Sequence, residues 1–363
     1  MTGPLLAGVD WTNVDAEHLA RQAEWRERAA ERSASERRRR LRQLEDSEGA
    51  VGRATRAYAS LPMPSVGVRL RETFVALDRP RERPGSPHGE IRRPRREAVE
   101  ADRRSRPPMS RLLATTSRAL PTYLSMLFVL NAERGAAPGE PRLNASRAAG
   151  GPESWAVLCG RWVGGQRARR ARLSRDLDAL SAVDLIGLSR VDGRTQYEQF
   201  TVLSDDTGDQ RYRPPTRGEG TVPLPANVFL NGWHLVLTPA ELAMLIDVHH
   251  AWRKNARATT IQGVGMATSK RWATYGVSDE TYSSVHELVE FGLVTLHDPM
   301  PNRRRGKIQT PPPAERARLE GEGVSLAPET YRLAPQSHDC FARPALTVVN
   351  ACLTLSPVAP RHV

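Results

Sequence analysis

The chain has 363 residues, and its 53 Lys and Arg residues outnumber its 41 Asp and Glu residues, which gives a formal net charge of +12. No apolar run approaches the ~20 residues that a membrane-spanning helix needs, and the first residues lack the basic and apolar segments of a secretory signal. The composition therefore argues against a membrane protein and favours a polyanionic partner: nucleic acid, an anionic membrane surface or an acidic protein.

Arginine supplies all but three of the cations, the exceptions being Lys254, Lys270 and Lys307. Its guanidinium group forms bidentate contacts with phosphate and with guanine, which suits DNA. A GC-rich genome would also favour arginine over lysine, but it would not explain the positive net charge. The three cysteines form no CxxC pair, which predicts a reduced, cytoplasmic protein.

Residues 1–60 are predicted to form a charged helical arm. Strong helix formers dominate the stretch DAEHLARQAEWRERAAERSASERRRRLRQLED, but its apolar residues are too sparse for a stripe that faces a core. The arm could lie in solvent, mediate oligomerisation or place its basic run, Glu36–Arg42, on phosphates; the mixed charges favour solvent.

Residues 61–108 are predicted to be a flexible linker. The first part, SVGVRLRETFVALD, could form a pair of strands. The second part, RPRERPGSPHGEIRRPRREAVEADRRSRPP, is rich in Pro and Arg and has almost nothing to bury, so it is expected to be disordered.

Residues 109–205 are predicted to form a first domain. An apolar helix (ALPTYLSMLFVLNAERG) and a short helix (ESWAVLCGRWV) precede a turn at Gly164–Gly165. A third helix opens at Gln166 and is followed by a strand. Asp192–Gly193 then predicts a tight hairpin turn before the returning strand TQYEQFTVL.

A polar linker at 206–220 precedes a second predicted domain at 221–336, and a tail covers 337–363. The lead-in VPLPANVFLNGWHLVL is strand-like, and Thr238, Pro239 and Glu241 predict the capped start of a helix. A short helix (TSKRWATYG), a turn, a helix capped by Ser278, the strand LVTLHD and, after a long insert, the strand ETYRLAP complete the order.

The two predicted domains contain a repeat. Without gaps, SRDLDALSAVDLIGLSR at 174–190 aligns with YSSVHELVEFGLVTLHD at 282–298, so that Leu177 falls on Val285. In each copy the apolar spacing changes from helix to strand at Asp184 or Gly292, where a helix end needs a left-handed residue. The chain therefore predicts two copies of a unit with three helices and a two-stranded hairpin.

This unit resembles the winged-helix DNA-binding proteins. The resemblance rests on LSRDLDALSAVDLIGLSR and on GVSDETYSSVHELVEFGLVTL, and it covers roughly residues 110–335. The first copy departs from the family pattern at Asp184, where a glycine is usual. The resemblance implies an α+β, mainly helical fold: two tandem winged helices preceded by a charged helical arm and a disordered Arg/Pro linker. It also implies that the third helix of each unit enters the major groove and that the hairpin, or wing, reaches the backbone or the minor groove.

The outer face of the first unit's third helix is predicted to be basic. If its leucines face the core, Arg172 and Arg175 lie on the opposite face at ~100° per residue, with small alanines between them that permit a close approach to DNA. A solvated basic helix is the alternative interpretation. In the second unit the corresponding helix carries Glu287 and Glu290, which would repel phosphate, so basic residues elsewhere are predicted to hold DNA there.

The predicted DNA-binding residues fall on both third helices, on the helix before the second one and on the two wings. They are Arg167, Arg169, Arg170, Arg172, Arg175, Arg194, Lys270, Arg271, Ser283, His286, Arg303, Arg304, Arg305 and Lys307.

No enzymatic site stands out. His249 and His250 are adjacent on a helix, with no carboxylate or cysteine at ligand spacing, so a core or surface position is predicted rather than a metal site. The glycine-rich stretches GRWVGGQR and IQGVGMATSKR fail the phosphate-loop pattern. The sequence predicts a protein without catalytic residues, metal or cofactor.

The predicted function is sequence-specific binding of double-stranded DNA. Two unequal winged helices in one chain resemble the layout of plasmid replication initiators, so the predicted partners are double-stranded DNA and host replication or transcription proteins, near the nucleoid, with no membrane. A transcription regulator would have the same layout. The sequence is compatible with a homodimer as the oligomeric state. A winged-helix module for protein–protein interaction is the alternative of another class.

Overall fold

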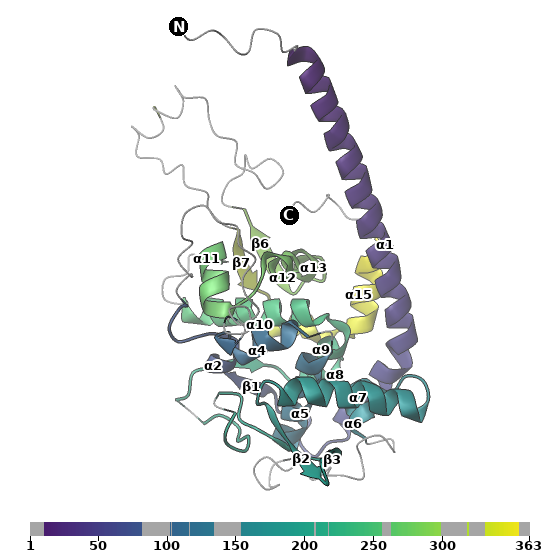
Figure 1. Ribbon diagram of the computed structural model, residues 1–363, viewed down its shortest axis with the longest axis vertical. Helices are drawn as coiled ribbons and strands as arrows, with labels where there is room; N and C mark the ends of the chain where they lie inside the picture. Colours follow the sequence, from purple (N-terminus) through teal and green to yellow (C-terminus); the bar gives the residue numbers. More distant parts are fainter. Residues whose placement is uncertain are drawn as a thin grey trace.

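The computed structural model describes residues 11–81, 102, 104–115, 117–133, 154–206, 208–216, 218–255, 263–298, 318 and 331–355 (Figure 1). The protein is α+β and mainly helical, as predicted, and its strands form small antiparallel sheets. Among the described helices, none combines the length and apolar character needed to cross a membrane.

A single helix, α1 (Trp11–Ala59), forms the charged arm, and its N-terminal part extends beyond the rest of the described chain (Figure 1). The C-terminal half packs on the core, where Leu44, Val51, Ala54 and Tyr58 are buried. The prediction that the arm lies in solvent therefore fails for its C-terminal part, where Val51, Ala54 and Tyr58 follow the charged stretch and pack on the core. Alanine and the tyrosine ring add to the few leucines, and spacings of seven, three and four keep these residues on one face.

The first unit, residues 119–202, has the predicted order of helices and strands. Its elements are α5 (Ala119–Ala132), α6 (Trp155–Leu158), α7 (Gln166–Ser181), β2 (Ile186–Val191) and β3 (Arg194–Val202). β2 and β3 pair antiparallel, and the turn residues Asp192 and Gly193 have φ angles of 49° and 73°. Two positive φ angles are the signature of the tight hairpin turn predicted at this dipeptide.

The second unit, residues 239–335, repeats this order with an additional short strand. Its elements are α10 (Pro239–Lys254), β5 (Val264–Gly265), α11 (Thr268–Lys270), the π-helical turn η1 (Arg271–Tyr275), α12 (Asp279–Ser283), α13 (Val285–Glu290), β6 (Val294–His297) and β7 (Arg332–Pro335). The sheet order is β5-β7-β6. The predicted capping box of Thr238 and Glu241 is present, as is the Ser278 cap. The single helix predicted from Ser278 is interrupted at Ser284.

The third helices of the two units end in the same way. Asp184 and Gly292 both have left-handed backbone, with φ angles of 61° and 70°, as predicted. The amide of Leu185 donates to the carbonyl of Leu180 over 3.0 Å, and the amide of Leu293 donates to that of Leu288 over 2.9 Å. These are equivalent positions in the ungapped alignment, so the sequence repeat is also a repeat of backbone hydrogen bonds.

Residues outside the two units add further elements to the same body. They are β1 (Val68–Arg71), α2 (Glu72–Val75), α4 (Pro108–Leu113), β4 (Thr221–Leu224), α8 (Asn227–Leu230), α9 (Trp233–Val236), the 3-10 turn η2 (His338–Ala342) and α15 (Ala345–Thr354). The strand-like lead-in to the second unit is thus mostly helical, because only its first residues pair as β4.

β1 and α2 lie within the predicted linker, at 61–108. The stretch proposed there as a strand pair supplies one strand, and its partner is β4, about 150 residues further along the chain. Phe74 and Val75 of α2 are buried. Part of the predicted linker therefore contributes to the core, through Val68, Leu70 and α2, because β1 is held by a distant strand rather than by a local hairpin.

One contiguous apolar core joins both units, α1, α9 and α15. Polar contacts also cross between the parts: Arg40 of α1 forms an ion pair with Glu241 of α10 at 2.5 Å. At the centre, the Tyr58 hydroxyl lies 3.1 Å from Nε2 of His234, and burial lowers the pKa of His234 to about 3. A neutral imidazole at this place fixes α1 against α9 by hydrogen bonding without a buried charge.

Candidate nucleic-acid interface

Helix α7 has one apolar face and one basic face. Leu173, Leu177 and Leu180 are at most 2% exposed and anchor the helix to the core. On the opposite side, Arg167 and Arg175 are exposed with Ala171 between them. These three residues follow at intervals of four, so they form a row along the outer surface.

A buried carboxylate holds the inner side of α7. Asp176 accepts two hydrogen bonds of 2.6 Å from the guanidinium of Arg161, one of 3.0 Å from Thr122 Oγ1 and one of 3.0 Å from the backbone amide of Arg118. Sequence analysis missed this cluster. The available signal was an acid placed between Leu173 and Leu177, on the face that the leucines bury.

Two of the predicted contact residues turn back toward the loop before α7. Arg169 Nε donates to the carbonyl of Gly164 over 2.7 Å, and its guanidinium lies 3.7 Å from the centre of the Trp162 ring. Arg172 Nη1 donates to the carbonyl of Val163 over 2.5 Å. Both side chains are half-buried, so the predicted pair Arg172 and Arg175 does not form one exposed face; Arg175 lies on it with Arg167.

Arg170 is also exposed on α7, beside this row. The only acid at the margin, Asp178, is bound by the hydroxyl of Tyr197 on β3 at 2.9 and 3.0 Å. This contact ties the hairpin to the helix and engages the carboxylate. The outer surface of α7 exposes Arg167, Arg170 and Arg175 against this one acid, so its net charge is positive.

The β2–β3 hairpin continues the basic surface. Arg190 and Arg194 are exposed on either side of the turn, and the hairpin lies beside α7 at one end of the molecule (Figure 1). Arg194 was predicted; Arg190 was missed, although its place two residues before the turn could have indicated it. We call the set Arg167, Arg170, Arg175, Arg190 and Arg194 the basic face.

The predicted residues of the second unit are largely engaged inside the protein. Arg271 is buried; its Nη2 donates to Asp279 over 2.8 Å, and its guanidinium lies 3.7 Å from the centre of the Tyr282 ring. Arg271 therefore holds η1 against α12. It was predicted to lie on the DNA-binding surface, but its side chain is buried. Ser283 is half-buried and donates to the carbonyl of Glu280.

Two other predicted residues of this unit, Lys270 and His286, are half-buried, and the His286 ring lies 6.3 Å from that of Tyr331. The predicted basic wing residues Arg303, Arg304, Arg305 and Lys307 lie outside the described residues. The described part of the second unit thus presents no counterpart of the basic face.

The acids of the second unit do not all face outward. Glu290 accepts hydrogen bonds of 2.6 and 2.8 Å from Arg37 of α1, and Arg37 also donates to the carbonyls of Cys352 and Leu355. Glu290 was predicted to repel phosphate; in the structure its carboxylate is paired with an arginine of the arm. Asp279 is likewise engaged, by Arg271.

The adjacent histidines of α10 are buried, and burial lowers the pKa of each to about 4. Nδ1 of His250 lies 3.0 Å from the hydroxyl of Tyr275, and the His249 ring lies 6.1 Å from that of His338. Within the described part of the chain, no three His, Cys, Asp or Glu residues gather in a way that could hold a metal ion.

Comparison with protein-family models, with curated proteins and with solved structures gives no match.

Proposed function

We propose that both units are winged helices and that the protein binds double-stranded DNA in a sequence-specific manner without catalysis. The order of elements supports this proposal: three helices and a hairpin in the first unit, and a three-stranded sheet of order β5-β7-β6 in the second. In this arrangement α7 enters the major groove of the DNA and the β2–β3 hairpin lies along its backbone.

The basic face is the observation that carries the proposal. An α-helix has about the width of the major groove, and the small Ala171 between Arg167 and Arg175 lets the helix axis approach the bases. Arg190 and Arg194 extend the cationic surface to the hairpin, where phosphates would lie. Since Arg169 and Arg172 bind carbonyls of the preceding turn, their role is to hold that turn.

The layout of two unequal units supports a plasmid-type replication initiator as the biological role. A transcription regulator would use the same interface. A genetic assay separates them: an initiator supplied in trans maintains a plasmid that carries its origin, whereas a regulator alters only the output of a promoter. Sequencing the DNA that is immunoprecipitated with the protein from its host identifies the site needed for this assay.

A protein–protein interaction module is the second candidate. It is favoured by the second unit, whose cation Arg271 is buried and whose exposed surface includes Glu280. Fluorescence anisotropy with a labelled random duplex separates the two classes. Binding that weakens steeply as salt rises supports the DNA proposal, because phosphate contacts release counterions. No binding even at low salt contradicts it.

Variants of two arginines of α7 provide the residue-level test. Binding is measured between the full chain and a duplex selected from a random pool. Arg175→Ala should weaken specific binding by about 1–3 kcal/mol, as expected for an arginine that contacts a base. Arg172→Ala should weaken it less, because its guanidinium is held by Val163. Arg53→Ala, at an exposed position of α1, is the matched control and should leave binding unchanged. Equal binding by Arg175→Ala and the parent protein would show that α7 does not read the duplex.

A further inference from the structure

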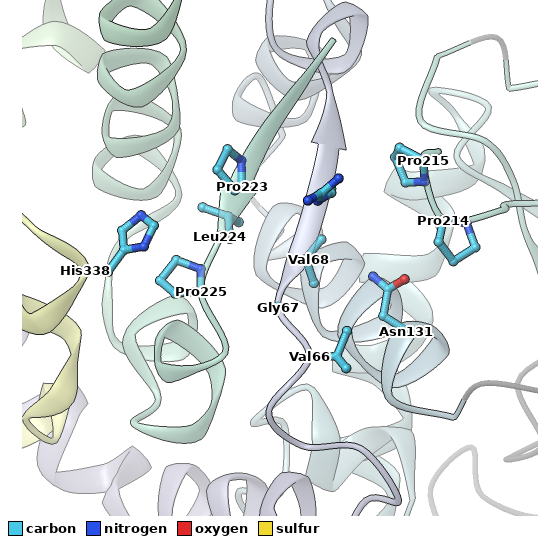
Figure 2. Close-up of a pocket in the computed structure, with 11 residues that line it drawn as sticks. Val66, Gly67, Val68, Asn131, Pro214, Pro215, Pro223, Leu224, Pro225 and His338 are labelled. Carbon is cyan, nitrogen blue, oxygen red and sulfur yellow. The ribbon is translucent and has the colours of Figure 1, made fainter. Parts of the chain in front are cut away.

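A groove of about 530 Å³ runs over the small sheet formed by β1 and β4. Figure 2 shows Asn131, Pro214 and Pro215 beside β1, and Pro225 and His338 on the far side of β4. The residues that line the groove are apolar or neutral except for Arg69 and His338, and none is acidic. No residue of the basic face lines the groove, and neither unit's third helix contributes to it.

The pairing register of β1 and β4 determines which backbone N–H and C=O groups of β1 are not bonded to β4. Arg69 lies opposite Pro223, and Val68 and Leu70 lie opposite Leu224 and Val222. In an antiparallel pair, alternate residues exchange both of their hydrogen bonds with the partner strand. Pro223 has no N–H and cannot take part in such an exchange. The bonded pairs are therefore Val68–Leu224 and Leu70–Val222.

Two contacts of the same strand agree with this alternation. The amide of Glu72, which continues the bonded series, donates to the carbonyl of Gly220 over 3.0 Å. The amide of Arg71, in the other series, points away from β4 and donates to Asp205 Oδ2 over 2.8 Å. Arg69 belongs to the series of Arg71, so its N–H and C=O also face the outer edge of β1, toward the side of Asn131, Pro214 and Pro215.

We propose that this groove binds an extended acidic peptide of a partner protein, which adds a strand to the outer edge of β1. The N–H and C=O of Arg69, which no described residue of the chain bonds, would pair with the peptide backbone, as in other cases of β-strand addition. The prolines of the walls offer apolar surface but no competing N–H groups. The peptide's carboxylate meets the exposed guanidinium of Arg69, which no other described side chain engages.

Charge decides between the occupants that an open strand edge could accept. A second copy of β1 would bring its own Arg69 against the same arginine, which disfavours self-pairing. Arg71 adds nothing to this repulsion, because Asp205 and Glu219 bind its guanidinium. The protein's net charge of +12 also disfavours self-pairing. An acidic partner segment has the opposite charge and is attracted to the groove.

Hydrogen exchange of the full chain, followed by NMR, tests the open edge. In the free protein the Arg69 amide should exchange much faster than the Leu70 amide, which is bonded to Val222. Equal protection of the two amides would mean that the chain itself occupies the edge, and this would overturn the proposal. Protection of Leu70 also reports that the sheet is folded in each variant.

Selection from a phage-displayed library of random ten-residue peptides on the immobilised full chain tests the partner chemistry. The recovered peptides should contain Asp or Glu, protect the Arg69 amide and lose at least tenfold in affinity when alternate backbone nitrogens are methylated. Arg69→Glu should weaken their binding at least tenfold, and exchanging the acid of the peptide for lysine should restore it. Arg53→Glu, on α1, is the matched control and should bind like the parent.

A library that yields no binder would overturn the proposal and leave Arg69 and the prolines as protection against aggregation of the strand edge. Peptides that bind Arg69→Glu as tightly as the parent would overturn it as well. These outcomes are independent of DNA binding, which involves a different surface.

Discussion

The third helices of the two units share a backbone and differ in what their polar residues do. In α7 the outer surface displays arginines, and its one buried acid, Asp176, is held by Arg161. In α12 and α13 the corresponding residues are acidic or small, and Arg37 and Arg271 reach in from elsewhere to neutralise Glu290 and Asp279. Apolar positions thus set the shape of the unit, while the partners of its charged residues decide which surface is available for a ligand.

The largest expected effect comes from the shared apolar positions. Leu177 is fully buried and corresponds to Val285 in the second unit. Leu177→Asp should lower the free energy of unfolding by about 5 kcal/mol or more, since it removes a core side chain and buries an unpaired charge. Urea denaturation followed by far-UV circular dichroism measures this loss. Ala171→Asp, on the exposed side of α7, is the control and should cost far less; equal stability of the two variants would contradict the burial of Leu177.

The next effect concerns a position where the two units differ. Asp176 corresponds to Ser284, whose hydroxyl donates only to the carbonyl of Thr281. Asp176→Ser should destabilise the protein by about 3 kcal/mol, because the guanidinium of Arg161 loses its counter-ion in a largely buried place. Ser284→Ala should cost less than about 1 kcal/mol. Similar losses for both variants in the same urea experiment would mean that the ion pair contributes nothing specific to the first unit.

A third difference lies in the first helices. When YLSMLF at Tyr123 of α5 is aligned with ELAMLI at Glu241 of α10, Val129 corresponds to Asp247. Asp247 is fully buried, no described residue hydrogen-bonds to either of its carboxylate oxygens, and burial raises its pKa well above the usual value. In the unfolded chain the carboxyl ionises above about pH 4, whereas in the folded chain it stays neutral, so the parent loses stability as the pH rises.

Asp247→Val should therefore stabilise the protein by about 2 kcal/mol at neutral pH. The gain should shrink as the pH falls toward about 4, where the unfolded carboxyl is also neutral. Urea denaturation of parent and variant at several pH values measures the difference. A gain that does not change with pH would assign the effect to packing rather than to the proton.

The smallest effect concerns the helix ends, where Asp184 takes the backbone conformation that Gly292 takes in the second unit. Asp184→Gly should stabilise the protein by about 0.5–1 kcal/mol, because glycine adopts a positive φ without strain. The ion pair of Asp184 with Arg111 is long, at 3.9 Å, and its loss should cost little. Gly292→Asp is the reciprocal control and should lose a similar amount of stability. Thermal unfolding measures the stability of both variants. A lower stability of Asp184→Gly than of the parent would contradict the assignment of backbone strain to Asp184.

The sequence by itself determined the features that depend on neighbouring residues. The repeat, the Asp192–Gly193 turn, the capping box of Thr238 and Glu241 and the left-handed Asp184 were all predicted, because each depends on hydrogen bonds within about five residues. Helical spacing also placed Arg175 opposite the leucines, but it placed Arg172 beside it, whereas the structure exposes Arg175 together with Arg167. Prediction failed where a segment pairs with a distant part of the chain. The segment assigned to a linker, for example, supplies β1, whose partner strand is β4.

Only the tertiary structure decided which charges remain available. Arg37 meets Glu290 across 253 positions of the chain, and Arg40 meets Glu241 across 201. No local pattern distinguishes these arginines from Arg38 or Arg39, which are exposed on the same helix. The physical reason is that an ion pair depends on proximity in space, which the packing of α1 against the core creates, whereas a turn or a cap is complete within its own few residues.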